Sequence, residues 1–154
     1  MFKKIIIIVV TIVIVLALTF FATLIKKAFA SHQSHTVAGI SADNQLALCP
    51  NKPNCVCSDH EVNDTHYIDA LDAKHWDALI DYLNAKSNAD IISQTPTYIH
   101  ATFTTLIMRY VDDVEFHLRP DEGIIAVRSA SRVGYSDLGA NRKRIESIRS
   151  KLNP

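Results

Sequence analysis

The first thirty residues are almost uniformly hydrophobic, whereas the rest of the chain alternates short apolar and polar stretches. An apolar run begins at Ile5 and ends at Ile25, and it contains no charged residue, glycine or proline. As a helix this run would be about 31 Å long, which matches the ~30 Å hydrocarbon core of a bilayer. No polar stripe marks one face of it, as a helix on a protein surface would require. The pattern predicts a single N-terminal transmembrane helix.

Two later segments have the period of amphipathic helices. Asp72 is a good N-cap, and the helix that it would begin reaches about residue 87. Its apolar positions follow the i, i+3, i+4, i+7 spacing and comprise Trp76, Leu79, Ile80 and Leu83. A C-terminal helix is expected to begin at Ser136 or Asp137. The apolar stripe of this second helix comprises Leu138, Ile145, Ile148 and Leu152.

Between these helices the sequence is typical of β-strands. A short strand is expected at 91–93, followed by a long one at 97–110 that is rich in Thr, Ile, Tyr and Phe. Two further strands are expected at 114–118 and 124–130. The Pro-Asp-Glu-Gly sequence at 120–123 favours a turn between them.

The turn also predicts a register for this hairpin. Phe116 would face Val127 on the core side, and Glu115 would face Arg128 on the other side. A shift by one residue would place Arg128 beside Phe116 and bury an unpaired charge, which is costly. The chain is therefore expected to have an α+β fold, an antiparallel sheet with helices packed on one face, preceded by the transmembrane helix.

The chain divides into three parts. Residues 1–27 are the expected membrane anchor, residues 28–45 are small and polar and resemble a flexible linker, and residues 46–154 form the α+β domain. The alternative is a signal peptide ending at Ala30, because Ala-Phe-Ala at 28–30 fits a cleavage pattern. The length of the apolar run and the lysines at 26 and 27 favour an uncleaved anchor.

The charge distribution indicates on which side of the membrane the domain lies. The chain has 16 basic and 16 acidic residues, but four lysines lie within the first thirty residues. The remainder therefore has 12 basic and 16 acidic residues, a net charge of −4. Lys3, Lys4 and the α-amine outweigh Lys26 and Lys27, which favours an inside N-terminus and an exported domain. An exported domain of net −4 is not expected to bind nucleic acid.

Three cysteines lie within nine residues, at positions 49, 55 and 57. In an exported chain this spacing favours a disulfide, and Cys49 with Cys55 is the expected pair because one intervening residue makes a 55–57 bridge awkward. The alternative is a zinc or copper site, for which the candidate ligands are Cys49, Cys55, Cys57, His60 and His66. The spacing is not that of a zinc ribbon, so we expect no metal and no cofactor.

The densest group of polar residues follows the last strand. We expect an anion site there, because guanidinium forks and the N-terminus of a helix both suit carboxylate or phosphate. The candidate binding residues are Arg128, Ser129, Ser131, Arg132, Gly134, Tyr135, Gly139, Asn141 and Arg142. The competing interpretation is a structural ion-pair network in which Asp112, Asp113 and Glu115 neutralise the arginines, with Asp137 capping the helix.

A hydrolase is the second functional hypothesis. It would use Ser129 or Ser131 as nucleophile, His100 or His117 as base, and Asp112 or Asp113 to orient the base. The chain contains neither G-x-S-x-G nor S-x-x-K, and both histidines fall on the strand parity opposite to Ser129. A non-enzymatic role is therefore favoured.

Three blocks of sequence resemble a bacterial family of proteins, domain-of-unknown-function family 1499. They are Cys-Pro-x-x-Pro-Asn-Cys-Val at 49–56, Arg-Tyr-Val-Asp-Asp-Val-Glu-Phe at 109–116, and the segment 128–139 with Asn-Arg at 141–142. The likeness covers residues 46–152, and it departs from the family at Cys57, where a serine is expected. It implies a small exported or membrane-tethered protein but no established activity.

Taken with the anchor, the resemblance favours a single-pass protein of the bacterial inner membrane, with the C-terminal domain in the periplasm or outside the cell. Residues from Ile5 to Ile25 would contact the bilayer. The domain is expected to bind an anionic small molecule or a lipid headgroup without catalysis. An envelope hydrolase and a purely structural or partner-docking domain remain the alternatives.

Overall fold

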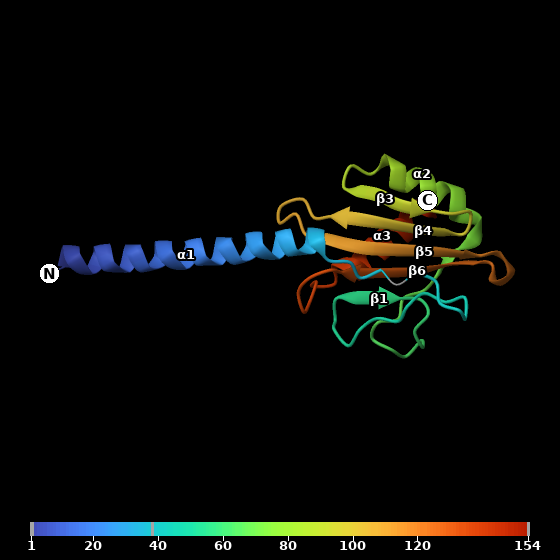
Figure 1. The fold of residues 1–154 in the computed structure, drawn as a ribbon, viewed down its shortest axis with the longest axis horizontal. Coiled ribbons are helices and arrows are strands. Elements are labelled where there is room, and N and C mark those ends of the chain that lie inside the picture. The colour runs from blue at the N-terminus through green and yellow to red at the C-terminus, as the bar shows by residue number, and fades with distance from the viewer. Residues whose placement is uncertain (1, 38, 154) are drawn as a thin grey trace.

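A computed structural model of the chain describes residues 2–37 and 39–153. The long helix α1 (Phe2–Gln33) projects from a folded domain (Figure 1). The domain contains one antiparallel sheet, the helices α2 (Trp76–Ala85) and α3 (Ala140–Leu152), and two 3-10 turns, η1 (Ala73–His75) and η2 (Pro120–Glu122). The α+β class expected from the sequence is confirmed.

The sheet has six strands, five of which follow the order β1-β6-β5-β4-β3, while β2 also pairs with β6. Their bounds are β1 (Cys55–Cys57), β2 (Leu71–Asp72), β3 (Ala89–Gln94), β4 (Tyr98–Thr104), β5 (Val111–Arg119) and β6 (Ile124–Ser131). The two shortest strands, β1 and β2, were not expected from the sequence. Both lie beside β6, and the prolines and asparagines around β1 keep it at the edge of the sheet.

The hairpin register expected from the sequence is confirmed. Glu115 pairs with Arg128, and Phe116 pairs with Val127. The turn between β5 and β6 is η2, and it closes at Gly123, whose φ of 68° lies in the left-handed region that favours glycine. The hydrophobic pattern therefore fixed the register, because a slip of one residue would exchange the two faces.

One face of the sheet, the helix face, packs against α2 and α3 over the main hydrophobic core. Alternate strand residues and the apolar stripes of both helices meet there. The buried side chains of this core include Leu79, Leu83, Ile99, Phe103, Val114, Phe116, Ile125, Val127, Ile145 and Ile148. Trp76 and Ile80 are partly buried and pack against the same core, as the helical spacing predicts.

The opposite face of the sheet, the polar face, is covered by the connecting segment (residues 34–37 and 39–46). Figure 1 shows this segment crossing the sheet after α1 ends. The sequence predicts a flexible linker over 28–45, whereas here residues 28–33 belong to α1, and Thr36 and Gly39 donate hydrogen bonds to strand side chains. Leu46, the last residue of the segment, is buried with Cys57 and Ala126.

Several boundaries differ from the expectation: the helix expected to begin after Asp72 begins at Trp76, after η1, and two other differences leave an apolar residue exposed. The strand predicted over 97–110 ends at Thr104, because the chain turns between Thr105 and Tyr110, and Ile107 is 85% exposed instead of packing in the core. The C-terminal helix begins at Ala140 rather than at Ser136 or Asp137. Leu138 is consequently 88% exposed and does not belong to the apolar stripe of α3.

Candidate functional site

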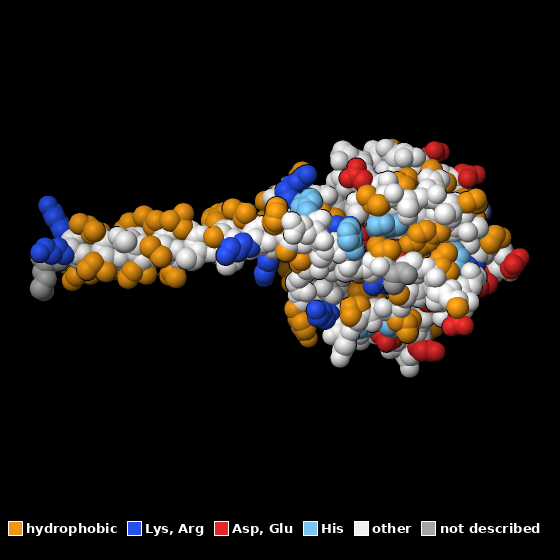
Figure 2. All heavy atoms as spheres, viewed as in Figure 1, with side chains coloured by type: hydrophobic (Ala, Val, Ile, Leu, Met, Phe, Trp, Pro, Cys, Tyr) orange, Lys and Arg blue, Asp and Glu red, His pale blue; other side chains and the backbone are white. Residues whose placement is uncertain are grey.

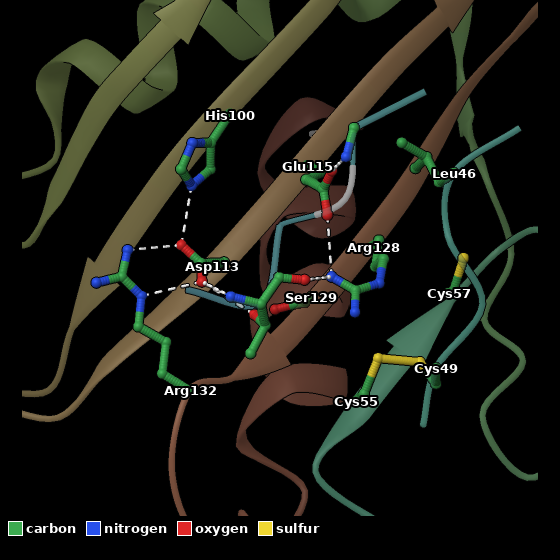
Figure 3. Close-up of polar contacts among 12 residues, drawn as sticks. Leu46, Cys49, Cys55, Cys57, His100, Asp113, Glu115, Arg128, Ser129 and Arg132 are labelled. Carbon is green, nitrogen blue, oxygen red and sulfur yellow. Dashed lines mark hydrogen bonds and ion pairs between the residues drawn. A yellow bond between two sulfur atoms is a disulfide. The ribbon is translucent and has the colours of Figure 1, made fainter. Parts of the chain in front are cut away.

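A buried carboxylate on β5, Asp113, organises the first half of the polar face. Both of its oxygens accept hydrogen bonds from Arg132, at 2.7 Å from Nη2 and 2.9 Å from Nε. His100 on β4 bonds the same carboxylate at 2.9 Å, and Thr36 donates both its backbone N–H and its hydroxyl. Figure 3 shows the side chains of His100, from β4, and of Arg132, just after β6, pointing at the Asp113 carboxylate.

Glu115, two residues further along β5, organises the second half. Its carboxylate accepts from Arg128 at 2.9 Å, from the Tyr98 hydroxyl at 2.8 Å and from the backbone N–H of Gly39 at 3.0 Å. Arg128 also donates to the carbonyl of Thr36. Glu115 is fully buried, so this pair is sealed from solvent by the connecting segment.

The environment shifts the pKa of two groups on this face, Asp113 and Tyr98. Burial alone would raise the pKa of Asp113, but hydrogen bonds from His100, Arg132 and Thr36 hold it well below the ordinary value. Burial and the adjacent Glu115 carboxylate raise the pKa of Tyr98, which therefore stays a hydrogen-bond donor. The Asp113 carboxyl is thus held in its ionised form beside the Arg132 guanidinium.

The third arginine of the expected anion site lies elsewhere. Arg128 and Arg132 point to the polar face, whereas Arg142 belongs to α3 on the helix face and donates to the carbonyls of Thr65 and Tyr67. The three guanidinium groups therefore do not converge. The expected partners Asp113 and Glu115 do pair with Arg132 and Arg128, as the competing ion-pair interpretation proposes.

The remaining candidate residues gather near the start of α3. Asp137 accepts from the backbone N–H groups of Gly139 and Asn141, so a carboxylate already occupies the N-terminus of α3. The carbonyl of Gly134 accepts from Asn54, and Tyr135 is 70% exposed in the loop before the helix. This arrangement caps a helix and orders a loop.

The two serines proposed as nucleophiles lie on the helix face. Ser129 bonds Asn141 at 2.6 Å, and Ser131 accepts from the amide of the same asparagine at 3.0 Å. His100 bonds Asp113 on the polar face, and His117 accepts from Arg119 there. Within residues 2–37 and 39–153, no histidine hydrogen-bonds either serine, so the structure assembles no serine–histidine pair.

The third expected charge partner, Asp112, has a partner that the sequence did not suggest. It forms an ion pair with Arg144 of α3, which also donates to Ser129 and Asn141. Together they form a second buried polar cluster, on the helix face. Strand alternation in 111–119 separates Asp112 from Asp113 and Glu115, and this signal was available in the sequence.

The cysteines adopt the expected pairing. Cys49 and Cys55 form a disulfide, and Cys57 is a buried free thiol whose pKa burial raises to about 11. That disulfide removes two of the ligands of the alternative metal site. His60 and His66 do approach each other, joined through the carboxylate of Asp64, but His60 Nε2 accepts the backbone N–H of Cys49. Its other nitrogen lies 3.3 Å from the Asp64 carboxylate, and Nδ1 of His66 lies 2.9 Å from the same group.

Two residues of the polar face, Tyr98 and Thr36, were missed as functional candidates, and His100 was expected only as a catalytic base. Tyr98, His100 and Thr36 complete the coordination of the two carboxylates. Parity along 97–104 places the tyrosine and the histidine on one face, but only the folded chain brings residue 36 to strand β5. Thr36 and Asp113 are 77 positions apart in the sequence, so no local pattern predicts their contact.

The fold and the charge network define a small α+β domain joined to an apolar helix. Among the described residues, α1 alone is long and apolar enough to cross a membrane, and it is compatible with a single-pass anchor or a signal peptide. Residues 45–152 match the family model described as protein of unknown function (DUF1499), and the chain belongs to this family. No curated protein and no solved structure matches the chain.

Proposed function

We propose that the protein is a single-pass envelope protein with a non-enzymatic domain fixed to its membrane anchor. One observation carries this proposal: the last turn of α1 is bonded directly into the sheet. Ser31 is fully buried, its hydroxyl accepts the backbone N–H of Val111, and its carbonyl accepts from Arg132. His32 bonds the carbonyl of Arg109 in the same region. These bonds fix the end of α1 to the domain.

The same contacts favour an uncleaved anchor over a signal peptide. The pattern Ala-Phe-Ala at 28–30 lies inside the continuous helix α1, and Ser31 immediately after it is enclosed by the domain. The peptide bond between Ala30 and Ser31 is thus part of the folded structure. Cleavage there would also leave a charged amine at a buried position, which is unfavourable.

The compartment follows from two further features. A disulfide between Cys49 and Cys55 is typical of an oxidising compartment, which for a bacterial inner-membrane protein is the periplasmic side or the exterior. Lys3 and Lys4 precede the apolar run and favour a cytoplasmic N-terminus. Both features support a domain that faces away from the cytoplasm.

The polar face supports a structural, partner-docking role more than a catalytic one. Its carboxylates accept backbone N–H groups of the connecting segment, while Arg128 and Arg132 donate to backbone carbonyls of Thr36 and Ser31. An anionic ligand would have to displace Asp113 or Glu115 from these arginines and leave a buried carboxylate unpaired, which is costly. The network thus binds the main chain of the protein itself and holds the domain to its anchor.

A pair of C-terminal fusions and the mass of the extracted protein test this proposal. An alkaline phosphatase fusion is expected to be active, and a fluorescent protein that matures only in the cytoplasm is expected to stay dark at the same position. The unfused protein extracted from membranes is expected to keep its full mass of 17.2 kDa. A fluorescent C-terminal fusion, or a mature chain that begins at Ser31, would overturn the proposal.

A further inference from the structure

We infer that two loops at one end of the domain, residues 105–110 and residues 133–139, rest in the surface of the lipid bilayer beside α1. These segments are called the tip loops below. The inference rests on the proposed membrane anchor, and it adds a second contact between the protein and the bilayer. The partner is a phospholipid membrane, at the boundary between the headgroups and the hydrocarbon.

The antiparallel register places both tip loops at the α1 end of the sheet. The first joins β4 to β5 and the second follows β6, and Asp112 pairs with Ser131 at this end. The η2 turn lies at the opposite end of the same strands. Figure 1 shows both loops projecting toward α1 and the β5–β6 turn pointing away from it.

Both tip loops expose large apolar side chains to solvent. Leu106 is 86% exposed and Ile107 is 85% exposed in the first, and Tyr135 and Leu138 are 70% and 88% exposed in the second. At the opposite end the turn presents Pro-Asp-Glu, with two acidic residues. Apolar residues that gather at one end of a domain mark an interaction surface, while single scattered ones need no explanation.

The first tip loop lies at the height of the predicted membrane span. A groove of about 280 Å³ separates it from α1, and its lining includes Phe21, Leu24, Ile25, Ala28, Ile107 and Met108. Since the apolar run of α1 ends at Ile25, a helix that spans the bilayer brings Ile107 to the hydrocarbon boundary. The rigid junction at Ser31 keeps the loop at that height, so lipid is the material that would fill the groove.

Charge at the same end suits a phospholipid surface. Lys26 and Lys27 follow the apolar run and are exposed on α1, and Arg109 is exposed in the first tip loop. Figure 2 shows Lys and Arg side chains around the junction of α1 with the domain, and Asp and Glu side chains concentrated on the far side. Basic residues beside apolar anchors are attracted to anionic headgroups, while the acidic end is held away from them.

The test uses the full chain in vesicles of phosphatidylethanolamine and phosphatidylglycerol, with an environment-sensitive fluorophore on single introduced cysteines. Ile107→Cys and Leu138→Cys report the two tip loops, and Asp121→Cys in the η2 turn is the matched control at the distal end. Cys57 is buried, so the protein without an introduced cysteine serves as the labelling blank. Nitroxide-bearing lipids are expected to quench the probes at 107 and 138 about twofold or more over the probe at 121.

A second arm separates this inference from the anchor on which it rests. Flotation of the labelled vesicles reports the anchor, because a chain without a membrane-spanning helix stays at the bottom of the gradient. The inference is overturned if the protein floats but all three probes are quenched only by a water-soluble quencher. That result would leave the anchor proposal in place. Protein that does not float overturns the anchor proposal itself. Replacing both Leu106 and Ile107 by serine is expected to reduce lipid quenching at position 138, because the two loops share one surface.

Discussion

At the scale of single residues, the most informative feature is the number of charges buried on the polar face. Asp113, Glu115 and Arg128 are each at most 4% exposed, yet each is paired. Buried ion pairs seldom add stability relative to apolar residues of similar size, although breaking one is costly. In some proteins such pairs confer specificity, and here they bond the main chain of the connecting segment.

Arg132→Ala tests this arrangement directly. The variant leaves a buried carboxylate without its guanidinium partner, so we expect a loss of about 3 kcal/mol in the free energy of unfolding. Asp113 keeps its hydrogen bonds with His100 and Thr36, so this loss is at the low end of the range for a broken buried ion pair. Urea denaturation measures it. The exposed Lys143→Ala should change stability by less than about 0.5 kcal/mol, and an equal effect of both variants would contradict the ion-pair role.

His117 gives the fold a pH dependence. Burial and the neighbouring Arg119 lower its pKa below the ordinary value of about 6.5, and its Nδ1 accepts a hydrogen bond from Arg119. The unfolded chain therefore binds this proton at higher pH than the folded chain does. Stability should accordingly fall as the pH drops below about 6.5 toward the folded pKa. The melting temperature, measured between pH 7.5 and 5, should depend less steeply on pH in His117→Gln than in the parent protein. An equally steep dependence in both proteins would rule out His117 as the origin.

At the scale of elements, the segment before β1 is stabilised by a covalent link instead of regular secondary structure. The Cys49–Cys55 disulfide closes a loop with a sequence separation of 6, and β1 pairs with β6 immediately after it. The two prolines in this loop prevent a helix or a central strand. The bridge thus holds an edge strand in place.

Removal of that bridge should have a limited effect. For so short a loop, chain entropy predicts a loss of about 2 kcal/mol in the free energy of unfolding on Cys49→Ser. Chemical denaturation under oxidising conditions measures it, with the Cys57→Ser variant as a control that keeps the bridge. Loss of stability on adding a reductant should be seen in Cys57→Ser and not in Cys49→Ser; the reverse pattern would contradict the assigned pairing.

The N-terminus of α3 is the second element whose boundary rests on a few side chains. Asp137 accepts two backbone N–H bonds there and also bonds the side chain of Asn141. Asp137→Ala should cost about 1 kcal/mol, as the loss of a cap usually does. Denaturation curves of Asp137→Ala and of the control Ser150→Ala, at the exposed C-terminal end of α3, measure the two losses in stability. Equal curves for the two variants would show that the cap is dispensable.

At the scale of the whole molecule, the connecting segment turns a helix and a domain into one body. Its two backbone N–H groups bonded to Asp113 and Glu115 are the points of attachment. Native-state hydrogen exchange should therefore find the amides of Thr36 and Gly39 protected. Glu115→Gln should release protection at Gly39 more than at Thr36, whereas fast exchange of both amides in the parent protein would show that the segment is free.

The pattern of the sequence determined the apolar helix, the α+β class, the β5–β6 register and the disulfide pair, because each depends on local periodicity or short spacing. It also anticipated the pairing of Arg128 with Glu115, since that contact follows from the register. It failed at 105–110 and at 136–139, where apolar residues such as Ile107 and Leu138 fit a strand or helix period but lie in exposed loops.

Only the tertiary structure decided what the polar face contacts. Contacts such as Thr36 with Asp113 join residues 77 positions apart, and no local pattern encodes them. The same is true of the three expected arginines. Arg128 and Arg132 lie on the polar face, whereas Arg142 lies on the helix face, because α3 packs on that side of the sheet only. The sequence therefore determined the main helices and the longer strands, and the packing of these elements decided which charges meet.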